Sequence, residues 1–298
     1  MHTPTLVSAP GLQRHPMMAP VGARCSTDGV LQLVLQQRGT RTVVQDCYTH
    51  VPLQILRPVY LDDTGTAYIY LLNPGGGVVG GDTYTLTVTL DTGAQAYLTT
   101  PSATKIYATP GAPAQQRMTF TLHAEAVLTY LPGQTIPFAN AAMHQDMTIR
   151  LGAGACAFVG EILAPGRVAR QERFAYREYC TSLRVEDMHG RVLLRERSRL
   201  QPHSQPLRNL GLFEGYDYLG TFYALGDSQR LPASLAECLH ALLEQRPQLI
   251  GSATALAHGG LVARLLATDH SSVDQALLAI WDTLRRHVLG SPAVACRT

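Results

Sequence analysis

Hydrophobic and polar residues alternate with a period of two in many segments between about residues 28 and 200. The clearest case runs from Tyr84 to Leu90, where Leu86, Val88 and Leu90 share one face and threonines occupy the other. Successive side chains of a β-strand point to opposite faces, so this pattern predicts strands with one buried face. Glycine and proline clusters interrupt the runs at roughly the spacing of about eight to twelve residues that is typical of all-β folds. The alternation therefore restricts most of the chain to short, stacked strands.

Three segments share a coarse pattern of strand, small-residue turn and strand: Leu90–Thr100, Leu122–Pro132 and Leu151–Glu161. Successive hairpin-like units of this kind stack as layered sheets or as a β-solenoid. We therefore expect a mainly β fold of layered, solenoid-like sheets with many short strands.

The C-terminal third changes to helical spacing, with two helical elements near 232–246 and 272–289. Leucines recur at helical spacing in the first element, and Ser234 is its expected N-cap. The second carries an apolar stripe, and Ser272 with Gln275 forms a candidate capping box. We expect both helices to pack on the sheets.

Residues 1–25 are polar and interrupted by prolines, and they lack the basic and apolar regions of a signal peptide. This pattern predicts a flexible N-terminal tail, followed by a single β-rich domain over residues 26–298. With 298 residues, 46% of them hydrophobic, the chain can bury a substantial core.

Charge and hydropathy exclude two classes of partner. The formal net charge is +2 without a basic run, which argues against nucleic-acid binding. No window reaches the roughly 18 apolar residues needed to span a bilayer, so we expect no membrane partner. A soluble, cytoplasmic protein is the expectation.

Cysteine and histidine spacings do not form a known metal-binding motif. The six cysteines are far apart without a C-x-x-C pair, and no histidines form H-x-H or H-E-x-x-H. Structural zinc sites usually show such spacings, so we expect no tightly bound metal or other cofactor.

The densest glycine cluster runs from residue 73 to residue 82. Gly75, Gly77 and Gly80 satisfy G-x-G-x-x-G, but a dinucleotide site also needs a helix after the glycines. An alternating strand follows instead. We interpret the cluster as a turn that requires positive φ or close approach to another backbone, or that contacts a partner.

Two further positions raise the question of chemistry. Ser102 and Lys105 match S-x-x-K, but they lie between strands and lack the partner motifs of that enzyme class, so we expect no catalysis. Glu161 lies inside an apolar run, and a buried carboxylate needs a partner or a raised pKa. Two interpretations remain open: pairing with an arginine such as Arg167, or lining a polar passage.

Four blocks, in this order and spacing, resemble the UreD (UreH) family of urease accessory proteins: NPGGGVVGGD, LTTPSATKIY, LPGQTIPF and GEILAPGR followed by QERF. The resemblance extends from about Gly29 to Gly290. It implies a β-rich fold of stacked layers with a few helices. It also implies a non-enzymatic scaffold that binds UreF and the nickel-carrying GTPase UreG, docks on apo-urease and contacts nickel only in transit.

The same resemblance implies an internal passage for nickel, with Asp82, Glu161 and Glu196 as candidates for its lining. Oxygen ligands suit a passage that must release the ion. Two of these candidates also have a purely structural interpretation. Asp82 could equally be an exposed turn acid, and Glu196 an arginine-paired surface acid. The third block departs from the family pattern, because Gln134 stands where a glutamate is usual. The rival interpretation of the whole chain is a β-rich protein- or carbohydrate-binding module without a role in metal delivery.

Overall fold

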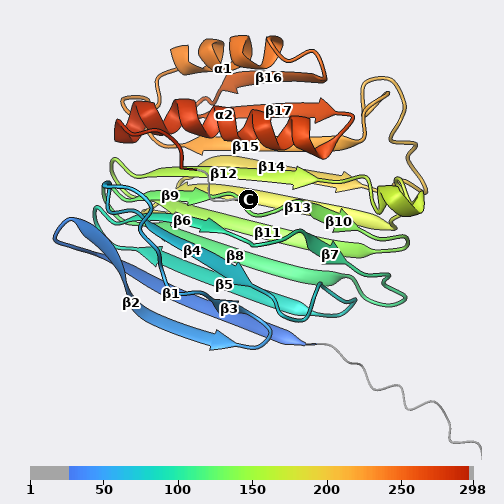
Figure 1. Ribbon diagram of the computed structural model, residues 1–298, viewed down its shortest axis with the longest axis horizontal. Coiled ribbons are helices and arrows are strands. Elements are labelled where there is room, and N and C mark those ends of the chain that lie inside the picture. Colours follow the sequence, from blue (N-terminus) through green and yellow to red (C-terminus); the bar gives the residue numbers. More distant parts are fainter. Residues whose placement is uncertain (1–26, 295–298) are drawn as a thin grey trace, which may run out of the picture.

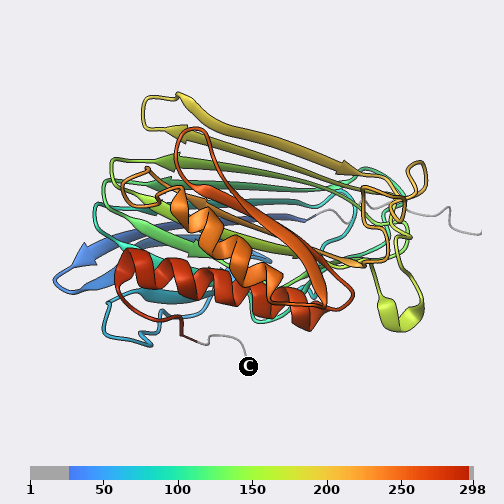
Figure 2. The ribbon, with the colours of Figure 1, turned by 90° about the horizontal axis from the view of Figure 1, so that it is seen from above.

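Two stacked β-sheets form the body of the protein, and two helices cover the outer face of one sheet (Figure 1, Figure 2). The structure is a computed structural model in which residues 27–294 are described, so the predicted tail of residues 1–25 lies outside the described part. Within that part, the expectation of a mainly β, layered and solenoid-like fold with two C-terminal helices is confirmed.

The first sheet has seven strands in the order β14-β13-β11-β8-β5-β1-β2. Their bounds are β1 Asp28–Arg38, β2 Arg41–His50, β5 Thr83–Leu90, β8 Ala114–Leu122, β11 Ala142–Leu151, β13 Glu178–Asp187 and β14 Val192–Leu200.

The second sheet follows the order β16-β17-β15-β12-β9-β6-β4-β3, with β10 and β7 attached beside β12. Their bounds are β3 Gln54–Ile55, β4 Ala67–Leu72, β6 Gln95–Thr99, β7 Thr104–Ile106, β9 Val127–Tyr130, β10 Thr135–Pro137, β12 Cys156–Leu163, β15 Tyr218–Leu225, β16 Leu249–Ala255 and β17 Leu261–Ala267.

The three repeated segments each form one rung of a solenoid. The first strand of a rung enters the seven-stranded sheet and the second strand enters the other sheet, so that β5, β8 and β11 are parallel neighbours, as are β6, β9 and β12. Leu90, Leu122 and Leu151 are in register across the first sheet. The prediction of stacked repeats is confirmed, but the two strands of a unit turn a corner and do not pair as a hairpin.

Each rung turns at a residue in the left-handed region. Gly93, Glu125 and Gly154 have φ of 71°, 59° and 65°, and they occupy equivalent positions in the three turns. The turns also hydrogen-bond to one another, because the Gly93 N–H donates to Ala124 O and the Glu125 N–H donates to Ala153 O, both at 2.9 Å. Stacked corners of this kind hold the two sheets in a fixed relation.

The core has two layers. Between the sheets, the inward faces of the alternating strands pack together and include Leu86, Val88 and Leu90. A second apolar layer lies between the second sheet and the helices α1 (Ser234–Glu244) and α2 (His270–Leu289).

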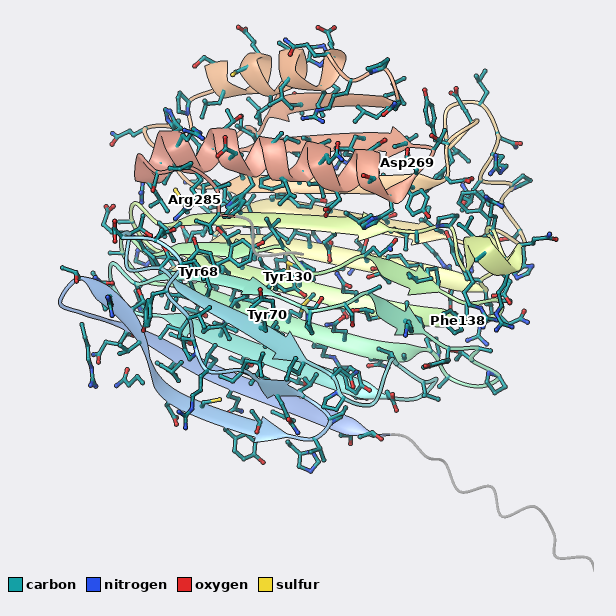
Figure 3. All side chains as sticks on the ribbon, viewed as in Figure 1. Tyr68, Tyr70, Tyr130, Phe138, Asp269 and Arg285 are labelled. Carbon is teal, nitrogen blue, oxygen red and sulfur yellow. The ribbon has the colours of Figure 1, made fainter. Side chains whose placement is uncertain are left out.

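Both helices lie where the sequence predicts them, but their N-cap residues differ from expectation. Ala233 precedes α1 without a side-chain cap, and Ser234 is already helical. Asp269 (Figure 3) caps α2 by accepting a 2.9 Å hydrogen bond from the Ser272 N–H. Ser272 therefore lies inside the helix and not at its cap. Gly290 ends α2 with φ 65°. Neither helix is long and apolar enough to cross a membrane, within the described residues.

Candidate functional site

The layer between the two sheets has two ends of different construction. At the corner end, the strands of the first sheet run into the turns at residues 91–94, 123–126 and 152–155. At the loop end, the same strands begin, and the glycine cluster of residues 73–82 packs against residues 100–106. The loop end contains a cavity.

The glycine cluster is shaped by close backbone packing, as one interpretation of the sequence predicted. The Val78 N–H donates to Lys105 O at 2.8 Å, and the Tyr107 N–H donates to Val78 O at 2.9 Å. A Cβ on Gly77 would lie 2.7 Å from Lys105 O, so only glycine allows this approach. The β-strand β5 follows the cluster, which confirms that it does not begin a helix.

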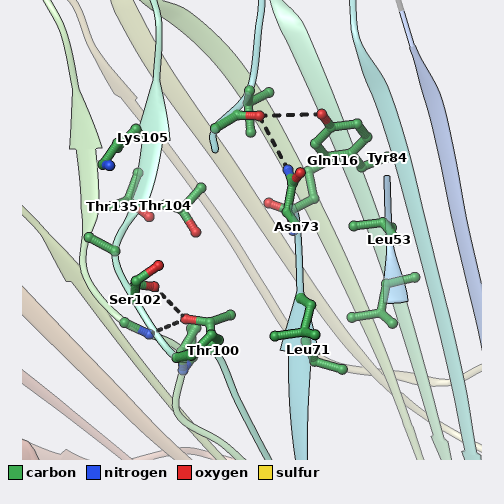
Figure 4. Close-up of a pocket in the computed structure, with 18 of the residues that line it drawn as sticks. Leu53, Leu71, Asn73, Tyr84, Thr100, Ser102, Thr104, Lys105, Gln116 and Thr135 are labelled. Atoms are coloured by element: carbon green, nitrogen blue, oxygen red, sulfur yellow. Dashed lines mark hydrogen bonds between the residues drawn. The ribbon is translucent and has the colours of Figure 1, made fainter. Parts of the chain in front are cut away.

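The third block continues the stack. Thr135 in β10 is in register with Thr104 in β7 and with Leu163 at the end of β12. The Gly133 N–H donates to Thr100 Oγ1 at 2.8 Å (Figure 4). The four blocks that carry the family resemblance therefore converge at the loop end.

A cavity of about 430 Å³ lies under these segments. Its lining combines apolar side chains of both sheets with hydroxyl, amide and carboxylate groups, and within the described residues it contains neither cysteine nor histidine. The polar lining residues include Asn73, Thr100, Ser102, Thr104, Gln116, Thr135, Gln145 and Glu161, several of which Figure 4 shows. Lys105, the lone lysine of the chain, is exposed at the rim.

Glu161 lies at the inner end of this cavity. It follows Val159 on the inward face of β12, and the Gln145 Nε2 of β11 donates a hydrogen bond to its Oε1. Tyr179 OH donates to Gln145 Oε1 at 3.2 Å, which fixes the orientation of the amide. The interpretation in which Glu161 pairs with Arg167 is wrong, because Arg167 binds Glu172 instead.

Burial raises the pKa of Glu161 above its ordinary value, the hydrogen bond from Gln145 opposes this shift, and the charge of Glu196 adds to it. Burial likewise raises the pKa of Tyr130 and of Tyr179, and the carboxyl group of Glu161 adds to both shifts. The polar groups around Glu161 therefore form a low-dielectric site in which negative charge is poorly compensated. A cation that entered would offset this cost.

A second, narrower cavity of about 20 Å³ continues from Glu161 toward the sheet edge. It shares Gln145 and Glu161 with the first cavity and adds Glu196 and Tyr223. Such a volume holds about one water molecule. Beyond it, Arg264 of β17 forms an ion pair with Glu196 of β14, joining the edge strand of the first sheet to the strand next to the edge of the second. The prediction of an arginine-paired acid at Glu196 is confirmed.

Asp82 has a different place. It is 3% exposed, so its interpretation as an exposed turn acid is wrong. Its Oδ1 accepts from the Thr27 N–H at 2.9 Å, and its Oδ2 accepts from the Val79 N–H at 2.9 Å and from Tyr84 OH at 3.0 Å. It is not among the described residues that line the cavity, and its bonds instead brace the glycine cluster.

Three residues of this site were missed by reasoning from the sequence: Gln145, Tyr179 and Arg264. A signal existed for Gln145, since it is in phase with the apolar residues Met147, Ile149 and Leu151 of its strand. A polar residue on a buried face needs a partner, and Glu161 is that partner. Arg264 gave no comparable signal, because its ion pair joins two sheets.

Comparison with known proteins agrees with the convergence of the four blocks. The family model described as UreD urease accessory protein matches residues 27–298. The chain belongs to this family. It is 35% identical over 273 residues to the urease accessory protein UreD of Actinomyces naeslundii, covering 91% of this chain and 99% of that protein.

Two further UreD proteins extend the comparison to distant organisms. The UreD of Cenarchaeum symbiosum is 30% identical, with 90% of this chain and 95% of that protein covered. The UreD of Herpetosiphon aurantiacus is 35% identical, with 88% of this chain and 92% of that protein covered. Membership of the UreD family supports a role in urease maturation.

Proposed function

We propose that this chain is a non-catalytic urease maturation factor that binds UreF, UreG and apo-urease and passes nickel toward the urease active site. Membership of the UreD family supports the maturation role. The observation that carries the nickel proposal is the polar line from the loop-end cavity through Gln145 and Glu161 to Glu196.

The chemistry of this line suits transit. Hydroxyl, amide and carboxylate oxygens bind Ni²⁺ less tightly than thiolate and imidazole groups do, so an ion can exchange along them. Glu161 supplies a buried carboxylate, whose negative charge burial disfavours unless a cation compensates it. Glu196 would receive the ion next, in competition with Arg264. Asp82 acts in this proposal as a brace of the cavity roof.

The test is urease activation in cells that express the structural subunits, the other accessory proteins and this chain in nickel-containing medium. Without the chain, we expect urease to remain nickel-poor and inactive. Glu161→Gln keeps the shape and removes the carboxylate, and we expect a loss of urease activity and bound nickel of about tenfold or more. Glu196→Gln should produce a smaller loss.

Glu237→Gln, on the exposed face of α1, is the matched control and should activate urease normally. Co-purification with UreF, UreG and urease separates failed transit from failed assembly, and Glu161→Gln should retain its partners. Normal maturation by Glu161→Gln would exclude a passage through this cavity. Equal maturation without the chain would contradict the maturation role itself.

A further inference from the structure

A second group of metal-binding side chains lies on the face of the seven-stranded sheet that is turned away from the second sheet. His144 of β11 and Cys180 of β13 are direct register partners on parallel strands. Glu178 lies two residues before Cys180 in β13, so the two side chains point to the same face of the sheet. The neighbouring Gln145 and Tyr179 are buried, which places His144, Glu178 and Cys180 on the opposite face. The three side chains lie on the opposite face of the sheet from the Glu161 passage, although the surface beside them shares Gln145 with it.

The three side chains converge closely enough to share one ion. His144 Nε2, a Glu178 carboxylate oxygen and Cys180 Sγ all lie within 4.8 Å of one another. His144 Nε2 is 3.3 Å from Glu178 Oε1, and Cys180 Sγ is 3.9 Å from Glu178 Oε2. Ligand bonds of about 2.0–2.3 Å in a tetrahedral site give ligand separations of roughly 3.3–3.8 Å. The separations of Glu178 from His144 and from Cys180 are therefore close to those of a tetrahedral site.

The surface is hollowed beside these ligands. A depression of about 310 Å³ is lined by His144, Cys180 and Arg199, among others. This leaves room for an ion and for water at an open coordination position. All three ligand residues are half-buried, so solvent exchange with the ion is possible while the carboxylate remains partly desolvated.

We propose that His144, Glu178 and Cys180 bind one borderline divalent transition metal of the zinc, cobalt and nickel class, with water as fourth ligand. A nitrogen, sulfur and oxygen donor set favours these ions over magnesium and calcium, which take oxygen ligands. On binding, Cys180 releases its thiol proton to solvent as the sulfur–metal bond forms. His144 binds through Nε2 and keeps its proton on Nδ1.

An arginine and a glutamine side chain both donate to the Glu178 carboxylate. Arg199 Nη2 donates to Glu178 Oε2 at 3.2 Å, and Gln201 Nε2 donates to the same oxygen at 3.4 Å. Arg199 is 65% exposed, so it can swing into solvent when the metal replaces it. The guanidinium competes with the ion, which gives a test that a purely structural cluster would not pass.

The experiment titrates Co²⁺ into the purified full-length chain without a histidine tag. Absorption reports thiolate coordination through a sulfur-to-cobalt charge-transfer band, and Zn²⁺ is then added as competitor. We expect one Co²⁺ per chain with this band. Cys180→Ser should abolish the band, and His144→Ala should weaken binding by about 10- to 100-fold. Arg199→Gln should strengthen binding by about 3- to 10-fold, because the competing charge is removed.

Cys47→Ser and Cys238→Ser are matched controls with exposed thiols. A Cys25→Ser/Cys296→Ser double variant controls for the cysteines near the two ends of the sequence. These variants should keep the band, and circular dichroism checks that every variant is folded. The proposal is overturned if wild-type chain shows no thiolate band, or if the band survives Cys180→Ser. It is also overturned if Arg199→Gln weakens binding, since Arg199 would then support the site and not compete with it.

Discussion

The two ends of the layer between the sheets are built from the same strands but filled differently. At the corner end, β8 and β11 contribute Phe120 and Ile149, both fully buried in a continuous apolar cluster. At the loop end, β11 and β12 contribute Gln145 and Glu161 on the same inward face, and a cavity replaces the packing. One end is dry and close-packed, and the other is polar and hollow.

The difference teaches how a sandwich can carry a polar interior without losing its core. The stacked corners and the apolar cluster fix the distance between the sheets at one end. The loop end then keeps its spacing while holding polar groups that do not pack. A cavity there costs stability that the corner end supplies.

The largest expected effect tests the dry end. Phe120 is fully buried in the apolar cluster between the sheets. Phe120→Ala should lower the free energy of unfolding by about 3–5 kcal/mol, since the apolar contacts are lost and a cavity remains. Urea denaturation followed by the fluorescence of Trp281, the lone tryptophan, measures it.

Thr104→Ala at the cavity wall is the comparison, and it should cost less than about 1 kcal/mol because that wall already lacks packed neighbours. Thr121→Ala, on the outward face of β8, controls for the loss of strand propensity. Similar costs for Phe120→Ala and Thr104→Ala would show that the two ends are equally packed and would remove the contrast.

Much of the fold followed from the period-two pattern, but the pairing of the strands did not. Alternation identified the buried face of Val88 and Leu90, because burial follows the pleat directly. The turns after Leu90, Leu122 and Leu151 were visible as repeats. Whether such a turn makes a hairpin or a corner depends on which strands pair, and that information lies in contacts between distant segments.

The candidate site divides in the same way. The apolar surroundings of Glu161 predicted a buried acid. The sequence also shows that Gln145 alternates in phase with the buried apolar residues of its strand. The ion pair between Glu196 and Arg264 joins two sheets, and the approach of His144 to Cys180 depends on parallel register. Neither leaves a local spacing that sequence reasoning can use.

The next effect sharpens the polar end through pH. An unburied glutamate has a pKa of 4.5. The pKa of Glu161 is raised above this value, mainly by burial. As pH rises above about 4.5, the unfolded chain loses this proton while the folded chain retains it, so stability falls until the folded pKa is passed. Glu161→Gln should remove this fall and raise the free energy of unfolding at neutral pH by about 1–3 kcal/mol.

Urea denaturation between pH 4 and pH 8 measures the difference between Glu161→Gln and wild type, which should grow with pH. Glu237→Gln on α1 is again the control and should stay within about 0.5 kcal/mol of wild type at each pH. A difference that shrinks as pH rises would mean that the folded chain stabilises the Glu161 carboxylate. The polar end would then be already compensated without a cation.

The smallest effect concerns the corners that hold the dry end in place. Gly93 has φ 71°, and an added Cβ would meet no atom within 4 Å, so Gly93→Ala should cost about 1 kcal/mol from backbone strain alone. Gly154→Ala adds a collision with Glu125, whose carboxylate is 3.4 Å from Arg230, and it should cost slightly more.

Measured in a Glu125→Gly background by the same urea denaturation, the Gly154→Ala cost should fall to that of Gly93→Ala, because the colliding side chain is gone and only the strain remains. If Gly154→Ala costs the same with and without the Glu125 side chain, the collision contributes nothing. Each corner would then be locked in the left-handed conformation independently of its neighbour. A neutral Gly93→Ala would instead mean that this corner relaxes to negative φ. The rigid spacing that lets the other end stay hollow would then have to come from the apolar cluster between the sheets.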